Sequence, residues 1–352
     1  MFTSTSTINL LFGFLCLILG TTHAAAFPTT ETPISTIYQF EKGSWLENLA
    51  VGPTDDSILA TRVDGPYLYR IHLPANPHAN ASTELVHTFS HFQSLAGITE
   101  YEPNAFAVIA GNLSLTDLAP GNFSIYSVRF PNDPPPHHHH PVVQKITDLP
   151  NSQFFLNGMT TLATCEEGEE ESTVLFCDSL TGRVYRLSPQ TGIYGLVLED
   201  STMKPSQPGN LGVNGIRTVT IGHDTYLYYD NSDTTTINRV RIDPATGRAT
   251  GPYTTLARGH FADDLVFDHE TGDVYVAAQK DNVLVRVTPD GHEAVVAGAP
   301  DRLTVAGPTS AVFGKGRQSR TLYVTTTGGS AAPINGTLTE GAKLMAFQVD
   351  CL

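Results

Sequence analysis

The sequence is poor in basic residues, with 20 Lys and Arg against 35 Asp and Glu and a formal net charge of −15. A protein whose main partner is a nucleic acid needs clustered Lys and Arg, so this balance excludes that class of partner. Charged residues are only 16% and hydrophobic residues 40% of the chain, which excludes an intrinsically disordered protein. Four cysteines in 352 residues are too few for a scaffold held together by disulfides.

The first 26 residues carry no charged side chain. An apolar run from Leu10 to Leu19 is followed by small residues that end at Ala26. This arrangement is typical of a secretory signal peptide, and the run is shorter than the roughly 20 apolar residues of a membrane span. We therefore predict a signal peptide over residues 1–26 and a mature chain without a membrane span. We expect the protein in the secretory pathway, and secreted.

Sequons and cysteines agree with this route. N-glycosylation is predicted at four N-x-S/T sequons, those of Asn80, Asn112, Asn122 and Asn335. Cys165 and Cys177 flank an acidic stretch, and we predict a disulfide between them in an oxidising compartment. The alternative is that both are free buried thiols, as Cys351 would then also be.

One pattern recurs six times along the rest of the chain. A polar or small pair opens an apolar strand, a second strand follows after a turn, and a third strand alternates apolar residues with Arg. The copies begin near residues 47, 96, 157, 214, 263 and 309, at intervals of 46 to 61 residues. These intervals are typical of the blades of a β-propeller. We predict an all-β fold in which residues 27–352 form a single closed domain, a six-bladed β-propeller. β-Sandwiches, the alternative, do not account for six matched copies.

The leading residues of the six first strands are expected to meet at one mouth of the central channel. Four of them carry oxygen ligands, namely Glu47, Asn157, Asn214 and Asp263. Two carboxylates and two amides suit one hard divalent cation, Ca²⁺ or Mg²⁺, whereas zinc would need His or Cys. The alternative is structural, because Asn and Asp also bond backbone groups at strand starts. There is no P-loop or dinucleotide fingerprint, so we expect no organic cofactor.

The motifs around these residues resemble those of the SMP-30/gluconolactonase-like propellers. The resemblance covers about residues 40 to 349 and rests on Leu46-Glu47-Asn48, Leu156-Asn157-Gly158, Val213-Asn214-Gly215, Ala262-Asp263-Asp264 and Tyr228-Tyr229-Asp230-Asn231. It implies that Glu47, Asn157, Asn214 and Asp263 bind one divalent metal. It also implies that Asp263 acts as the base in lactone hydrolysis.

The sequence departs from the sugar-lactone enzymes two residues before Asn157. Those enzymes carry an Arg at this position, where it can hold polar oxygens, but here the residue is Phe155. Other segments expected at the channel are also apolar, so we predict a pocket for lipophilic small molecules, lined by Trp45, Phe154, Phe155 and Phe261. The alternative is that these aromatic side chains pack between blades.

The opening pattern Trp45-Leu46-Glu47-Asn48-Leu49-Ala50-Val51 is similar to that of the fungal hetero-Diels–Alderases of tropolone–sesquiterpene pathways. That resemblance implies dehydration of a tropolone precursor to an o-quinone methide, followed by addition to a humulene-type alkene. Such chemistry needs a lipophilic pocket and a proton donor, and we expect His260, Asp263 or Asp264 to move the proton.

Three hypotheses about function remain open. The first is a hetero-Diels–Alderase of terpenoid biosynthesis, which the apolar channel mouth favours. The second is a metal-dependent lactonase or esterase acting on a lipophilic lactone, which the four oxygen ligands favour. The third is a secreted binding propeller without catalytic activity, in which the four polar residues are structural.

Overall fold

The computed structural model describes residues 34–54, 56–74, 80–113, 121–131, 140–162 and 172–349, with only the backbone of residues 150–154. The predicted signal peptide, Cys165 and Cys351 lie outside the described residues. Residues 32–352 group into one compact unit by their contacts. Within the described part of the chain, no helix is long and apolar enough to cross a membrane.

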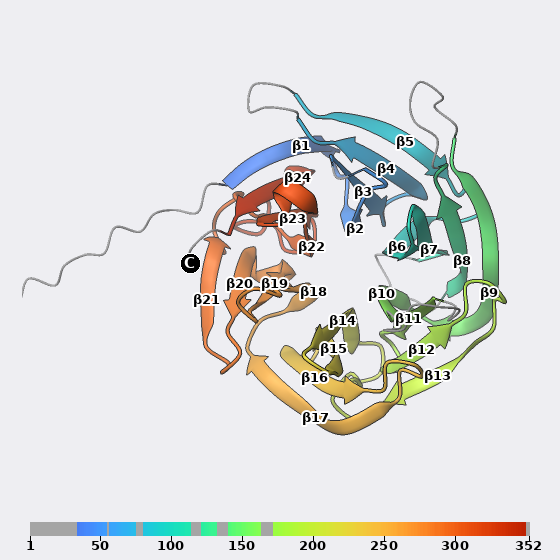
Figure 1. Cartoon of the computed structure of the whole chain (residues 1–352). Coiled ribbons are helices and arrows are strands. Elements are labelled where there is room, and N and C mark those ends of the chain that lie inside the picture. The colour runs from blue at the N-terminus through green and yellow to red at the C-terminus, as the bar shows by residue number, and fades with distance from the viewer. Residues whose placement is uncertain are drawn as a thin grey trace, which may run out of the picture. The chain divides into compact units, whose positions relative to one another are not determined.

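The described residues form six four-stranded antiparallel sheets, arranged as the blades of a ring (Figure 1). Each predicted copy begins one or two residues after the start of an innermost strand. These strands are β2 (Leu46–Val51), β6 (Ser94–Glu102), β10 (Leu156–Leu162), β14 (Val213–Ile221), β18 (Ala262–Phe267) and β22 (Pro308–Phe313). The predicted all-β, six-bladed β-propeller is therefore confirmed.

The second and third strands continue each blade outward. The second strands are β3 (Ser57–Arg62), β7 (Ala105–Gly111), β11 (Thr173–Asp178), β15 (Asp224–Asn231), β19 (Val274–Ala278) and β23 (Thr321–Thr326). The third strands are β4 (Tyr67–His72), β8 (Gly121–Arg129), β12 (Arg183–Leu187), β16 (Thr236–Ile242), β20 (Val283–Val287) and β24 (Gly341–Gln348). Two 3-10 turns, η1 (Gln279–Asp281) and η2 (Gly316–Gln318), interrupt the strand pattern.

The outermost strands were not predicted from the sequence. Five of them follow the third strands directly, namely β5 (Ser82–Thr88), β9 (Val142–Phe154), β13 (Tyr194–Glu199), β17 (Ala249–Arg258) and β21 (Glu293–Gly298). The sixth blade takes its outer strand from the other end of the unit, because β1 (Ile34–Lys42) pairs antiparallel with β24. The ring is thus closed by main-chain hydrogen bonds between the first and last strands.

The hydrophobic core lies between neighbouring blades. Every residue of β2, β3, β11 and β18 is buried, because both faces of an inner strand are covered by adjacent sheets. Leu46 and Ile58 of the first blade, for example, pack with Leu344 of the sixth. Burying one such side chain contributes about 1.5–3 kcal/mol, so the six interfaces together position the inner strands around the axis.

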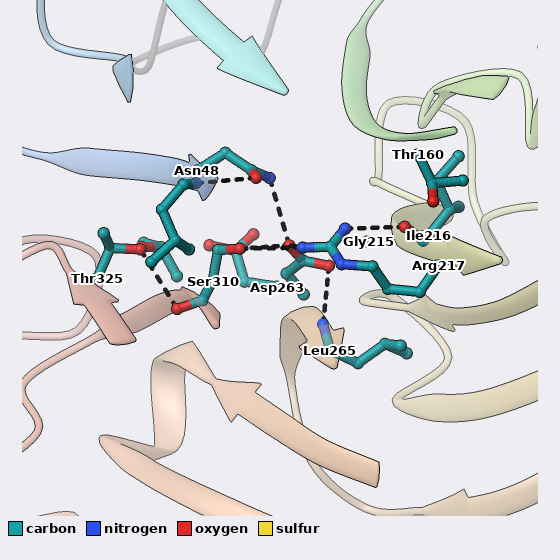
Figure 2. Close-up of polar contacts among 12 residues, drawn as sticks. Asn48, Thr160, Gly215, Ile216, Arg217, Asp263, Leu265, Ser310 and Thr325 are labelled. Carbon is teal, nitrogen blue, oxygen red and sulfur yellow. Dashed lines mark hydrogen bonds and ion pairs between the residues drawn. The ribbon is translucent and has the colours of Figure 1, made fainter. Parts of the chain in front are cut away.

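The residue after each leading residue decides how closely the inner strands approach. In three consecutive blades it is a glycine, and a Cβ at Gly97 or Gly158 would lie 2.4 or 2.2 Å from a carbonyl oxygen of the next blade. In the other three blades it is polar, and Asn48 Nδ2 and Ser310 Oγ both donate to Asp264 Oδ2 (Figure 2). Half of the axis is therefore closed by backbone contact and the other half by a side-chain network.

Candidate functional site

A cavity of about 300 Å³ lies over the leading residues of the inner strands. This volume is at the lower end of the range for small-molecule sites, about 300–1,000 Å³. Its large apolar lining residues are Trp45, Val63, Leu113, Phe155, Leu156, Leu211 and Phe261, and its polar lining residues are Glu47, Asn157, Asn214, Asp263, Gln279, Lys280 and Ser330. All four predicted ligands thus share one cavity with three of the four predicted aromatic residues. The Phe154 side chain lies outside the described residues.

Strand geometry explains this grouping. Successive side chains of a strand point to opposite faces, so residues two apart share a face. In three blades an aromatic residue directly precedes the inner strand, two positions before the leading polar one, and these pairs are Trp45 with Glu47, Phe155 with Asn157, and Phe261 with Asp263. Each of these blades therefore contributes one ring and one polar group to the same cavity.

Glu47 is one of two carboxyl groups in the cavity, and only 8% of the residue is exposed. The Trp45 Nε1–H donates a 2.8 Å hydrogen bond to Glu47 Oε2. Burial raises the pKa of Glu47 to about 7, although the Trp45 hydrogen bond lowers it, and the nearby charge of Asp264 raises it further. Burial therefore favours the protonated form of Glu47 at pH values where an exposed glutamate is ionised.

Asp263 is the second carboxyl group, and it accepts hydrogen bonds on both oxygens. Asn214 Nδ2 donates to Oδ1 at 2.7 Å, and Gln279 Nε2 donates to Oδ2. Burial raises the pKa of Asp263 well above its usual value, and repulsion from Glu47 and Asp230 raises it further. The two cavity carboxyls therefore hinder each other's ionisation.

The polar residues fit a hard divalent cation. Asn214 Oδ1 is buried and has no hydrogen-bond partner, because its Nδ2 is the atom that bonds to Ser232 and Asp263. A cation among the oxygens of Glu47, Asn157, Asn214 and Asp263 would use this unpartnered oxygen and offset the repulsion between the carboxylates. In the described residues no three His, Cys, Asp or Glu side chains gather in a metal-binding geometry, so such a site would depend on the two amides.

His260 and Asp264 do not line the cavity, which corrects the prediction that either moves a proton there. His260 Nδ1 lies 2.8 Å from Asp281 Oδ2, and Nε2 lies 3.4 Å from Glu293 Oε2. Asp264 is fully buried and accepts hydrogen bonds from Arg217, Asn48 and Ser310. Both residues are one position away from the cavity-facing pair Phe261 and Asp263, and their side chains bond to partners outside the cavity.

Two of the polar cavity residues that the sequence analysis missed lie on one short turn. Gln279 and Lys280 belong to η1, the short turn that joins β19 to β20. The only signal was their position in the chain. They lie in the connection between the second and third strands of a blade, which returns to the channel mouth and so places its polar residues near the leading residues. Their chemical types alone did not distinguish them from solvent-exposed loop residues.

The remaining predicted sites lie away from the cavity. The four sequon residues Asn80, Asn112, Asn122 and Asn335 are all exposed, and their glycosylation stays a prediction. Cys177 is a free thiol in β11, fully buried, and its Sγ donates to the Asn214 carbonyl at 2.9 Å. This placement does not favour the predicted disulfide. Because Cys165 lies outside the described residues, that bridge stays a prediction.

Comparisons with known proteins agree with the fold and add a functional direction. Residues 211–328 match the family described as SMP-30/Gluconolactonase/LRE-like region. The predicted resemblance to these propellers is confirmed. The structure is also similar to that of a calcium-binding protein, regucalcin, from Agrobacterium tumefaciens, with a TM-score of 0.62 and 14% identity over 90% of this chain and 95% of that one.

Two curated relatives match almost the whole chain. One, from Phoma sp., is 26% identical over 84% of this chain and 87% of its own length. The other, from Sarocladium schorii, is 23% identical over 83% of this chain and 78% of its own length. Both are named "putative hetero-Diels-Alderase". The chain is thus similar over most of its length to proteins with a pericyclase-type name.

Proposed function

We propose that this protein is a hetero-Diels–Alderase of fungal meroterpenoid biosynthesis. It assists dehydration of a hydroxymethyl-type tropolone precursor to an o-quinone methide, and then the stereoselective addition of that intermediate to a humulene-type sesquiterpene. The observation that carries the proposal is the composition of the cavity, in which seven large apolar side chains surround two carboxyl groups. The names of the two curated relatives support the same reaction class.

The dehydration needs one proton donor and one acceptor. A carboxyl group of Glu47 or Asp263 gives its proton to the leaving hydroxyl, and the carbon–oxygen bond breaks to release water. The ring hydroxyl of the precursor loses its proton either to the carboxylate formed in this step, which restores the carboxyl group, or to solvent before binding, in which case the carboxylate regains its proton from solvent. The substrate therefore loses one water and no electrons, and the product is the exocyclic o-quinone methide.

The addition needs only correct placement of the two partners. The methylene carbon and the carbonyl oxygen of the o-quinone methide form one carbon–carbon and one carbon–oxygen bond with the alkene, and no group leaves. Holding both partners in one orientation can supply several kcal/mol, about 7–11 in the best-oriented cases. Trp45, Phe155 and Phe261 enter the cavity from three different blades, so they would restrict which face of the alkene is approached.

A divalent cation is part of the proposal as an alternative use of the same polar groups. Glu47, Asn157, Asn214 and Asp263 would hold it. When bound, it would polarise a substrate oxygen and act as a Lewis acid. A carboxylate that holds a cation does not donate a proton at the same time, so the two roles are separable by experiment.

The test is a product assay with purified protein. A hydroxymethyl-tropolone precursor and a humulene alcohol are incubated with and without a chelator, and the products are resolved by chiral liquid chromatography and mass spectrometry. We expect one enantiomer of the adduct, formed faster than with heat-denatured protein. Racemic product at the background rate would reject this reaction. If the protein accelerates formation of one enantiomer without chelator but not with it, the cation has a role in the reaction.

A metal-dependent lactonase or esterase for lipophilic lactones is the second candidate. The unpartnered Asn214 Oδ1 beside two mutually repelling carboxylates favours it. Chelator-sensitive hydrolysis of a panel of lipophilic lactones, with no adduct in the first assay, would support this function. Absence of both activities would leave the non-catalytic binding propeller.

We further propose that the protein acts in the secretory pathway or outside the cell, with residues 1–26 as its signal peptide. The exposure of all four sequon asparagines supports this proposal, because glycosylation needs accessible side chains. A mass decrease after glycosidase treatment of the secreted protein is the expected result.

A further inference from the structure

The turn η1 is fixed residue by residue against the segment that ends in Asp263. The contacts run in antiparallel order: Gln279 donates to Asp263, the Lys280 ammonium lies 3.7 Å from the centroid of the Phe261 ring, and Asp281 bonds to His260 at 2.8 Å. The Asn282 side chain extends the attachment by accepting a 2.8 Å hydrogen bond from the Gly307 N–H. A side chain carried by η1 therefore has a defined position relative to the cavity.

Lys280 is the basic residue among the described residues that line the cavity. It is exposed, and it forms no ion pair with any carboxylate in the described part of the chain. The adjacent Asp281 is already bound to His260. An ammonium group over an aromatic ring is held by the negative face of the ring, and its remaining N–H donors stay available on the opposite side.

The charge of the rest of the protein makes the position of Lys280 relevant to the choice of ligand. The protein carries a net charge of −15, and Lys280 is a cation that lines the cavity. The net negative charge disfavours the approach of an anionic ligand, and a cation beside the cavity offsets that repulsion locally. A neutral lipophilic ligand, in contrast, needs no charged group there.

We propose that Lys280 is a specificity-determining residue that binds an anionic oxygen of the substrate at the cavity mouth. The substrate class is then a lipophilic acid, either an ionised tropolone hydroxyl or a carboxylate on an apolar skeleton. The tropolone case rests on the proposed function. Phe261 holds the ammonium in place, so the anionic end of the ligand stays beside Lys280 while its apolar part contacts the remaining rings.

The single tryptophan provides a direct binding measurement. Trp45 is the only tryptophan of the chain and lines the cavity, so its fluorescence reports a bound ligand independently of turnover. The probes are two pairs of an anion and its uncharged analogue: tropolone with 2-methoxytropone, and 1-naphthoate with its methyl ester. Titrations at mildly alkaline pH, where tropolone is ionised, are made on the wild type and on Lys280→Met, Lys280→Arg and the control Lys145→Met.

We expect the wild type and Lys145→Met to bind each anion more tightly than its neutral analogue. Lys280→Met should weaken anion binding about tenfold, which corresponds to about 1.4 kcal/mol, and leave the neutral analogues unchanged. Lys280→Arg should retain most of the preference, because it keeps the charge and can also stack on Phe261. Unchanged binding of the neutral analogue shows that the variant is folded.

The outcomes separate this inference from the proposed function. Preference for naphthoate without binding of tropolone would support the role of Lys280 and count against tropolone as substrate. Equal affinity for anion and neutral analogue in the wild type, or a preference that survives in Lys280→Met, would overturn the role of Lys280. The adduct assay described above would still decide the proposed function in that case.

Discussion

Trp45 and Glu47 lie two residues apart at the start of β2, and the indole Nε1–H of the first donates to a carboxylate oxygen of the second at 2.8 Å. The bond joins the largest apolar side chain of the cavity to one of its two acids. It fixes the ring and the carboxyl group relative to each other, so a ligand packed on the ring would lie beside a proton donor. The unit is built from one strand and does not depend on the packing of a distant loop.

Replacing a cavity acid by its amide, which has no acidic proton, should slow the reaction without unfolding the protein. Glu47→Gln keeps an oxygen that can accept the Trp45 hydrogen bond, and Asp263→Asn keeps the size of the side chain. We expect the variant that lacks the proton donor to form the adduct about 10²-fold more slowly or worse, as is typical for loss of a general acid, and the comparison of the two variants identifies the donor. Asp224→Asn, at an exposed position on β15, is the matched control. Wild-type rates in both cavity variants would contradict the proposed role of these acids.

Shortening one aromatic wall should loosen stereocontrol more than it affects the rate. Phe155 is 3% exposed in the cavity, and Phe106 is fully buried in the core between blades, so Phe155→Leu and Phe106→Leu remove the same atoms in two places. We expect both variants to lose about 1–2 kcal/mol of unfolding free energy in urea. Only Phe155→Leu should lower the enantiomeric excess of the adduct, measured by chiral chromatography. A similar decrease in both would indicate a general effect of destabilisation.

Arg217 should be essential for the stability of the axis. Its guanidinium donates to Asp264, a carboxylate with a side chain only 2% exposed. Arg217→Met leaves that charge uncompensated, and we expect a loss of about 3–5 kcal/mol in the free energy of unfolding. The double variant Arg217→Met/Asp264→Asn should recover part of this loss, because the buried group is then neutral. Arg239→Met, which removes a half-buried cation–π contact with Tyr226 and a 3.0 Å hydrogen bond to the Tyr228 hydroxyl but leaves no buried charge, is the control and should cost less than Arg217→Met. A double variant no more stable than Arg217→Met would contradict this explanation.

The ion pair between Asp268 and Arg320 should make stability depend on acid pH. Burial raises the pKa of Asp268, but the Arg320 hydrogen bonds at 2.9 and 3.1 Å and the Glu270 N–H outweigh burial, so the net pKa is lowered. A lowered pKa in the folded state gives stability that is present above the unfolded value of about 3.9 and is lost as pH falls through the folded value.

Urea denaturation across pH is the measurement for this pair. We expect Asp268→Asn to be less stable than the wild type by about 1–2 kcal/mol at neutral pH. The difference should stay constant down to about pH 5 and narrow towards zero at lower pH, as the wild-type carboxylate becomes protonated. If the difference in unfolding free energy between the wild type and Asp268→Asn does not change with pH at any acidic pH measured, the charge of Asp268 is not the source of that difference.

The arrangement of the blades could be predicted because the same sequence pattern occurs six times. The first two strands of each blade are largely buried and the third strand mixes buried with partly exposed residues, so the apolar patterns repeat. The leading residues Glu47, Asn157, Asn214 and Asp263 occupy equivalent positions in four copies. The outermost strands escaped prediction because half of each faces solvent, where the sequence is free to vary. Strand β13, with a single buried residue, is an example.

The site was predictable only as far as strand alternation was followed. Trp45, Phe155 and Phe261 share a face with the leading residues two positions later, and the structure brings them together. His260 and Asp264 were selected for their chemistry, but the structure pairs them with Asp281 and Arg217 outside the cavity. Gln279 and Lys280 required knowledge of where a short turn ends in space, which local sequence does not contain.

The pairing of β1 with β24 also has a consequence for the order of events during synthesis. Of the described strands, β1 leaves the ribosome first and its partner β24 leaves last. The sixth blade therefore cannot be completed until β24 has been synthesised. The carboxyls of the cavity come from blades one and five, and the sixth blade packs between those two blades, so the blade that separates them is complete only when β24 has been synthesised. Until then the nascent chain has an open inner edge and no assembled acid pair, so maturation of the cavity is coupled to completion of the polypeptide.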